Sequence, residues 1–483
     1  MSAQPNILLI ISDDHGYADR SATGNAPDAH TPGLDRLAAR STEFTNAYVS
    51  APICSPSRAG LIAGAYQKRW GAGWFGTSEF PPEDYRVLPE HLKNLGYRTG
   101  YFGKVHYGSE KPGDRACPDQ HGFDESYYGL AGMQTGRLNY LHHGEAAEEK
   151  YGEASRYMAV LPMIENGTEV PLEGFLTDEL AGRTRDFITE SVENDGDAPF
   201  FAMLAFNAVH NFCWQLPEEE LRARGLPAKS DWFPPGSELN ESGEGYEEWY
   251  QEAISPNLEH GREYYLAQLE LMDRQIGLTL DHLDELGVAE NTIVIYLTDN
   301  GGSTCNYGNN APLAGTKYTL WEGGIRVPFL VSWPGGGVPE GATNDSLTIS
   351  LDILPSLVAA AGGEIPHTTD GTDLLKRARG EESGAGRTLH WDTEWQWAVR
   401  DGDWKLTWVE DKDGGWSDQI RTYEHADAGR GLRLFNLAQD PGESDNLVEA
   451  EPEKAAELLD KQRGWLLEVA GPGARLPETK LEV

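Results

Sequence analysis

The sequence predicts an α/β fold, with a large, mostly parallel sheet sandwiched by helices and a smaller C-terminal α+β domain that contains an antiparallel sheet. Two observations support this prediction. Continuous apolar runs, which are typical of strands buried on both faces, occur at residues 6–11 and 292–297. Segments with helical periodicity lie between them, and such alternation of strands and helices indicates parallel strands.

The first strand is predicted at residues 6–11, where the run Asn-Ile-Leu-Leu-Ile-Ile is apolar without alternation. A helix is predicted over residues 31–40. Thr31 is a favourable N-cap for it, and the fixed φ of Pro32 suits the first helical position. These two elements form the first strand–helix unit of the expected sheet.

Further strands are predicted at residues 97–102 and 200–206. Apolar residues recur at helical spacing over residues 263–286, which predicts a long helix that Gly287 terminates. The run at residues 292–297 follows directly and predicts another buried strand. The strand–helix pattern therefore continues through most of the chain.

With 483 residues, the chain is too long for one ordinary domain. We expect a large α/β domain over residues 1–384, in which residues 214–262 form an acidic insertion rich in proline and glycine. Short strand-like segments and a terminal helix near residues 452–469 then predict a small α+β domain over residues 385–483.

The formal net charge is −39, from 78 acidic and 39 basic residues. A field of this sign repels nucleic acid and anionic membranes, so neither is expected as a partner. An enzyme that acts on anionic esters would need a local positive pocket. No segment reaches the roughly 18 apolar residues of a membrane span. As written, the sequence predicts a cytoplasmic protein, or a periplasmic or secreted one whose export signal was removed.

Carboxylate and amide side chains follow two of the predicted strands. Asp13 and Asp14 follow the first, and Asp299 and Asn300 follow the strand at residues 292–297. Sites in open α/β sheets form at the carboxyl ends of the strands, and three carboxylates gathered there would repel one another without a cation. Oxygen ligands favour Ca²⁺ or Mg²⁺ over zinc. Taken singly, each pair is more typical of a turn or a helix cap.

The segment Cys-Ser-Pro-Ser-Arg at residues 54–58 is more informative. We expect Ser55 to cap a helix that starts at Pro56, which places Cys54 just outside a helix N-terminus, where backbone N–H groups favour anions. Arg58 could then hold a charged group in bidentate fashion. A buried cysteine before an ordinary helix is the alternative, and the spacing excludes a cysteine phosphatase loop.

Residues 54–64 resemble the signature C-x-P-S-R-x-x-x-[LI]-x-[GT] of the type I, formylglycine-dependent sulfatases, which are arylsulfatase-like members of the alkaline phosphatase superfamily. Residues 103–108 are similar to the family's second signature, G-K-W-H-x-G, with Val105 in place of the usual Trp. Similar blocks follow in family order at residues 199–210, 298–302, 315–317 and 321–328.

The resemblance implies that a maturation enzyme oxidises Cys54 to formylglycine. It implies one bound Ca²⁺, with Mg²⁺ as the alternative, and the ligands Asp13, Asp14, Cys54, Asp299 and Asn300. The catalytic residues that it implies are Cys54, Arg58, Lys104, His106, His210 and Lys317.

The hydrated aldehyde at residue 54 would attack sulfur, and His106 would assist the step that releases sulfate. His210 or Lys317 would protonate the leaving oxygen, and both would bind the substrate sulfate. His143 and Trp321 are further candidates for substrate contact. A surface loop for His143 and aromatic packing for Trp321 are the alternatives.

The resemblance implies a sulfatase, and the long insertion and many aromatic residues favour a sulfated carbohydrate, either an algal polysaccharide or a glycosaminoglycan fragment. A formylglycine-dependent phosphonate monoester or phosphodiester hydrolase is the first alternative. A two-metal phosphatase fits less well, because Asn300 stands where those relatives place a histidine. A non-catalytic glycan-binding homologue is the third, although every expected catalytic position is filled.

Overall fold

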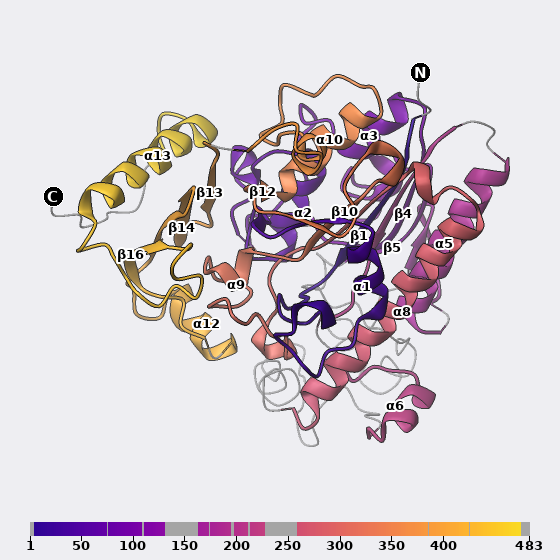
Figure 1. Cartoon of the computed structure of the whole chain (residues 1–483), viewed down its shortest axis with the longest axis horizontal. Coiled ribbons are helices and arrows are strands. Elements are labelled where there is room, and N and C mark those ends of the chain that lie inside the picture. Colours follow the sequence, from indigo (N-terminus) through magenta and orange to yellow (C-terminus); the bar gives the residue numbers. More distant parts are fainter. Residues whose placement is uncertain are drawn as a thin grey trace.

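The structure is a computed structural model that describes residues 4–474, except 75, 109–110, 131–162, 173, 195–197, 211–212, 228–257, 385 and 425. A ten-stranded sheet crosses the larger part of the described molecule (Figure 1), in the order β11-β2-β10-β9-β1-β8-β4-β5-β6-β7. Its strands are β1 (Asn6–Ser12), β2 (Thr42–Phe44), β4 (Arg98–Val105), β5 (Glu125–Leu130), β6 (Met163–Glu165), β7 (Thr168–Val170), β8 (Phe200–Ala205), β9 (Thr292–Thr298), β10 (Phe329–Ser332) and β11 (Ala342–Asn344).

The centre of this sheet is parallel. Strands β9, β1, β8, β4 and β5 run in one direction, whereas β10 pairs antiparallel with β9, and β6 pairs antiparallel with β5. The predicted mostly parallel α/β sheet is therefore confirmed, and the predicted strands correspond to β1, β4, β8 and β9.

Helices cover both faces of the sheet. They are α1 (Pro32–Ala39), α2 (Cys54–Ala63), α3 (Leu88–Asn94), α5 (Leu176–Asn194), α6 (Glu218–Arg224), α8 (Gly261–Glu285), α9 (Glu322–Ile325), α10 (Ile353–Ala360) and α11 (Leu374–Ala378). Alternate side chains of β1 point to opposite faces of the sheet. Ile7 and Leu9 pack in the core beneath α2, α3 and α10, and Leu8 and Ile10 pack in the core beneath α1, α5 and α8. This two-sided burial explains the unbroken apolar run.

Helix α1 begins at Pro32 with Thr31 in the N-cap position, as predicted, but the Thr31 side chain does not cap the helix. The Thr31 side chain makes no capping bond, and its Oγ1 accepts instead from the backbone N–H of Ser21 at 2.9 Å. The first turn is capped across space by Asp273 of α8, whose carboxylate accepts from the N–H groups of Gly33 and Leu34, each at 2.7 Å. A carboxylate on a packed neighbouring helix thus takes the place of the local hydroxyl.

The C-terminal part contains the predicted antiparallel sheet, formed by β13 (Thr388–Asp392), β14 (Gln396–Asp401), β15 (Trp404–Val409) and β16 (Gly431–Asn436). Helix α13 (Pro452–Ala470) packs on it, and α12 (Trp416–Glu424) precedes β16 (Figure 1). A short parallel pair, β3 (Ala47–Tyr48) and β12 (Thr348–Ile349), completes the strands of the described residues. The domain boundary at residue 384 stays a prediction.

Two further features bear on the sequence-based expectations. Most of the predicted acidic insertion, residues 228–257, lies outside the described residues, and its described flank contains α6. No helix in the described ranges combines the length and the apolar character needed to cross a membrane.

Candidate active site

The two strand-end pairs meet at one edge of the sheet. Strands β1 and β9 are adjacent and parallel, with Ser12 in register with Thr298. Asp13 and Asp14 therefore lie beside Asp299 and Asn300, as the carboxyl ends of neighbouring parallel strands must. All four side chains are buried.

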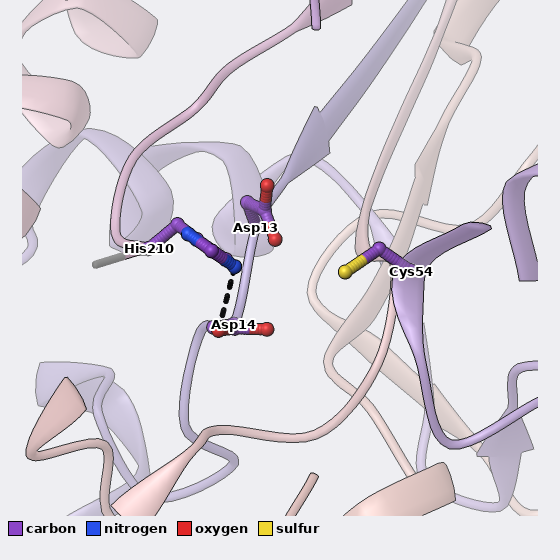
Figure 2. A group of neighbouring side chains, drawn as sticks. All are labelled: Asp13, Asp14, Cys54 and His210. Carbon is purple, nitrogen blue, oxygen red and sulfur yellow. Dashed lines mark ion pairs between the residues drawn. The ribbon is translucent and has the colours of Figure 1, made fainter. Parts of the chain in front are cut away.

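Cys54 reaches the same place from α2. Ligand atoms of Cys54, Asp13, Asp14 and His210 all lie within 4.8 Å of one another. Figure 2 shows the sulfur of Cys54 pointing toward the two aspartates, with His210 approaching Asp14 from the other side. His210 Nε2 lies 3.6 Å from Asp14 Oδ2. His210 therefore lies directly beside one of the proposed cation ligands.

The predicted start of α2 is wrong in detail. Cys54 is the first residue of the helix and Ile53 is its N-cap. Ser55 does not cap the helix, because its hydroxyl donates to Ser78 Oγ at 2.5 Å. Residue 54 still stands at the N-terminus of a buried helix, where the helix dipole favours negative charge. Gly64, with a φ of 64°, ends the helix in the left-handed conformation.

Three buried cations surround the carboxylates. Arg58 Nε donates to Asp299 Oδ2 at 2.8 Å, and the Lys104 ammonium contacts Asp13 Oδ2. The Lys317 ammonium lies 2.8 Å from Asp14 Oδ1. Three carboxylates and three cations thus form a balanced cluster in the protein interior. His106, which follows β4, is buried beside it.

The cluster has oxygen atoms to spare for a metal ion. Asp13 Oδ1 and Asn300 Oδ1 are buried and accept no hydrogen bond from the described residues. Asn300 donates its Nδ2 to Asp14 Oδ1 at 2.7 Å, which fixes the orientation of the amide. Unsatisfied buried acceptors are rare in folded proteins, and hard cations such as Ca²⁺ use these atoms as ligands. The donor set therefore fits the predicted cation.

Burial and local charge shift the acid–base behaviour of the carboxylates. Burial raises the pKa of Asp14 to about 7, with Lys317 opposing the shift and Asp13 and Asp299 adding to it. Burial also raises the pKa of Asp299. At Asp13, burial acts in the same direction, but the charges of Lys104 and Arg58 outweigh it and lower the pKa. A bound divalent cation would favour the ionised form of all three.

The thiol and the two imidazoles are held in their neutral forms. Burial raises the pKa of Cys54 to about 11, so the unmodified thiol is protonated at neutral pH. Burial, followed by the charge of Lys104, places the pKa of His106 well below its usual range. Burial and then Lys317 do the same at His210. Neutral imidazoles in contact with a reacting group can accept a proton.

The two remaining candidates are not brought into the cluster. His143 lies outside the described residues. The Trp321 ring packs against Phe435 of β16 with 5.5 Å between ring centroids, and the Arg433 guanidinium lies 5.5 Å from the same ring. These are packing contacts with the C-terminal sheet, and a substrate contact of Trp321 stays a prediction.

Sequence reasoning missed Asn306. Its Nδ2 donates to Asp14 Oδ2 at 2.6 Å, which makes it a direct neighbour of the proposed cation ligands. An asparagine in a loop of small polar residues is ordinary in a sequence. Only the folded position of the segment after β9 reveals this contact.

The chain is similar in sequence and in fold to known proteins. A family model described as sulfatase matches residues 5–363, and one described as N-sulphoglucosamine sulphohydrolase, C-terminal, matches residues 316–464. Arylsulfatase A of Bos taurus is 30% identical over 481 residues, covering 95% of this chain and 86% of that protein. A sulfatase of Formosa agariphila is 27% identical, covering 97% and 90%. The crystal structure of Ps i-CgsB in complex with k-i-k-neocarrahexaose superposes with a TM-score of 0.76 at 27% identity, over 96% of this chain and 92% of that chain.

Proposed function

The chain belongs to the sulfatase family and is a sulfuric ester hydrolase. We propose that it removes sulfate from a sulfated carbohydrate, and that the reaction uses formylglycine at residue 54 and one Ca²⁺. The observation that carries the proposal is the position of Cys54, whose sulfur lies within 4.8 Å of ligand atoms of Asp13, Asp14 and His210. A nucleophile at this place stands beside the proposed cation and three positive side chains.

The charge balance supports an anionic substrate. Three carboxylates face three cations in the cluster, so a bound Ca²⁺ would leave the pocket with a net positive charge. A sulfate monoester carries one negative charge and would be attracted there, although the chain as a whole has a net charge of −39. We propose that Asp13, Asp14, Asp299, Asn300 and residue 54 hold the cation.

The residues around the cation have distinct parts in the proposed reaction. When present, the formylglycine hydrate supplies the attacking hydroxyl and Ca²⁺ withdraws charge from the sulfate oxygens. Arg58 holds Asp299 in place, and Lys104 holds Asp13. Lys317 and His210, both beside Asp14, bind the sulfate. Lys317 gives a proton to the leaving oxygen, because burial holds His210 in its neutral form. The neutral His106 accepts a proton when sulfate is released.

An aromatic cluster beside Cys54 supports a carbohydrate substrate. Trp74 packs with Cys54 in one buried cluster, and its ring lies 5.4 Å from that of Trp416, which is 39% exposed. The Trp74 ring also meets that of Tyr318, with 6.2 Å between ring centroids. A rigidly supported, exposed tryptophan face suits a sugar ring. Ps i-CgsB, whose structure holds an oligosaccharide, supports the same class of substrate.

The substrate class is tested by a screen of defined sulfated oligosaccharides, with p-nitrophenyl sulfate and an aryl phosphodiester assayed in parallel. The Cys54 peptide is first checked by mass spectrometry for conversion to formylglycine by the maturation enzyme of the host. We expect sulfate release from at least one oligosaccharide. A strong preference for the phosphodiester would favour the phosphonate or phosphodiester hydrolase instead. Tight glycan binding without turnover, despite full modification, would favour a binding protein.

The nucleophile is tested by Cys54→Ala, with Cys117→Ala as the matched control because Cys117 is also buried and free. We expect Cys54→Ala to abolish turnover while thermal unfolding stays cooperative. Turnover near that of the wild type would show that the nucleophile is misassigned.

A further inference from the structure

Glu424 is a buried carboxylate at the end of α12, and its side chain reaches out of the C-terminal part of the chain into the catalytic part. It is fully buried. Its oxygens accept from Ser303 Oγ at 2.8 Å, Thr304 N at 2.8 Å, Thr316 Oγ1 at 3.1 Å and Cys305 N at 3.4 Å. No lysine or arginine of the described residues forms an ion pair with it, so neutral donors alone satisfy this charge.

These donors belong to two short segments that carry neighbours of the proposed cation site. Ser303 and Thr304 begin the turn that ends at Asn306, and Thr316 directly precedes Lys317. Asn306 donates to Asp14 Oδ2 at 2.6 Å, and Lys317 lies 2.8 Å from Asp14 Oδ1. Each segment therefore carries a residue that contacts the carboxylate of Asp14.

Hydrogen bonds of small polar groups join the two segments to each other, together with the backbone bond from Lys317 N to Gly302 O at 3.1 Å. Thr304 N donates to Thr316 Oγ1 at 3.0 Å, and that hydroxyl shares its single hydrogen between Gly302 O at 2.9 Å and Glu424 at 3.1 Å. Glu424 stands at the centre of this arrangement, since its carboxylate accepts from both sides. Without it, the N–H groups and hydroxyls would lose their shared acceptor inside the protein.

We propose that Glu424 is a positioning residue for the cation site: by holding Asn306 and Lys317 against Asp14, it sets the affinity for Ca²⁺ and the rate of catalysis. The inference rests on the proposed function, because it assumes that the carboxylates of the cluster hold Ca²⁺. Groups that orient metal ligands without touching the metal typically change affinity or activity by about 10–100-fold when they are removed.

Glu443 provides a matched control. It is also a buried carboxylate of the C-terminal part, and it accepts from Glu322 N at 2.6 Å and contacts Lys405 at 2.9 Å. None of these partners touches Asp14. Glu443→Gln therefore tests what the loss of a buried carboxylate between the two parts of the chain does without disturbing the segments that hold Asn306 and Lys317.

The experiment uses the full chain with formylglycine at residue 54, stripped of metal with a chelator. Ca²⁺ binding is measured by titration calorimetry, and kcat and KM are measured with p-nitrophenyl sulfate. We expect Glu424→Gln to weaken Ca²⁺ binding and to lower kcat, each by at least about tenfold. Glu443→Gln should reduce thermal stability but keep the Ca²⁺ affinity within about twofold of the wild type, since its contacts end outside the site.

Three outcomes would overturn the inference. If Glu424→Gln folds and keeps the Ca²⁺ affinity and kcat of the wild type, Glu424 has no positioning role, and the proposed function is unaffected. An equal loss of Ca²⁺ affinity in Glu443→Gln would reduce the effect to general destabilisation. A wild-type chain that binds no Ca²⁺ would remove the proposed cation site, and this inference with it. If Glu424→Gln does not fold, Thr316→Val deletes one donor and should change Ca²⁺ affinity in the same direction.

Discussion

The ammonium of Lys317 lies 2.8 Å from Oδ1 of Asp14, and both side chains are buried. Asp14 has a φ of 57°, so it turns the chain in the left-handed conformation directly after β1. Attraction to Asp14 raises the pKa of Lys317 far above its usual range, although burial opposes this shift. The pair joins the segment after β9 to the turn after β1 and holds a positive charge where the proposed substrate sulfate would bind.

Lys317→Ala tests this charge. We expect kcat to fall by about 10²–10³, the usual effect of removing one group that stabilises charge in the transition state. Lys376→Ala is the control, because that lysine is half-exposed and pairs only with Glu382 among the described residues. The kinetic constants are measured with p-nitrophenyl sulfate. A loss smaller than tenfold would contradict the proposed part of Lys317.

Removal of the cation tests the carboxylate cluster. We expect a chelator to lower the melting temperature, because Asp13, Asp14 and Asp299 then lose one of the positive charges that stabilise them. Returning Ca²⁺ at about 100 times its Kd should restore about 2.7 kcal/mol of stability. Thermal unfolding with Ca²⁺, with Mg²⁺ and with neither ion measures the effect. A melting temperature that does not respond to either ion would argue against a cation site.

Asp352→Asn tests a buried charge away from the site. Arg387 contacts both carboxylate oxygens of Asp352 at 2.5 Å, and Arg377 donates to it at 2.7 Å. Without the acid, the buried guanidinium of Arg377 and the partly buried one of Arg387 lose their partner, and a broken buried ion pair destabilises a protein by about 3–5 kcal/mol. We expect a loss of this size at pH 7, measured by denaturant unfolding, with the exposed Asp345→Asn as control.

The same variant has a defined pH dependence. Burial favours the protonated form of Asp352, but Arg387 and Arg377 outweigh burial and hold its pKa below the usual 3.8. A lowered pKa in the folded state contributes stability above the pKa of the unfolded chain, and this contribution is lost as the pH falls through the folded-state pKa. The stability difference between wild type and Asp352→Asn should therefore shrink below about pH 4. A stability difference that does not change with pH would contradict an ion pair between Asp352 and the two arginines.

Trp416→Ala tests whether the exposed ring of Trp416 contacts the carbohydrate. We expect KM for a sulfated oligosaccharide to rise by about 5–10-fold, the loss of one aromatic contact of about 1 kcal/mol. KM for p-nitrophenyl sulfate should stay unchanged, and Trp416→Phe should restore part of the loss. The exposed Leu467→Ala is the control for a general surface effect. An equal change with both substrates would place Trp416 outside the sugar-binding surface.

The central strands and the acids that follow them could be predicted from neighbouring residues in the sequence. The run at β1 is apolar because both faces of the strand are buried, and this burial leaves a local signature. Asp13, Asp14, Asp299 and Asn300 could then be placed together, because neighbouring parallel strands end at the same edge. The segment at residues 54–58 was identified in the same way, from adjacent residues alone.

The distant groups that complete each local feature could not be predicted from the sequence. Asp273 caps α1 in place of Thr31, Asn306 joins Lys317 at Asp14, and Glu424 reaches their segments from α12. Such contacts form between residues that are far apart in the sequence. They depend on the directions of side chains across packed elements, and no periodicity or spacing in the chain records those directions.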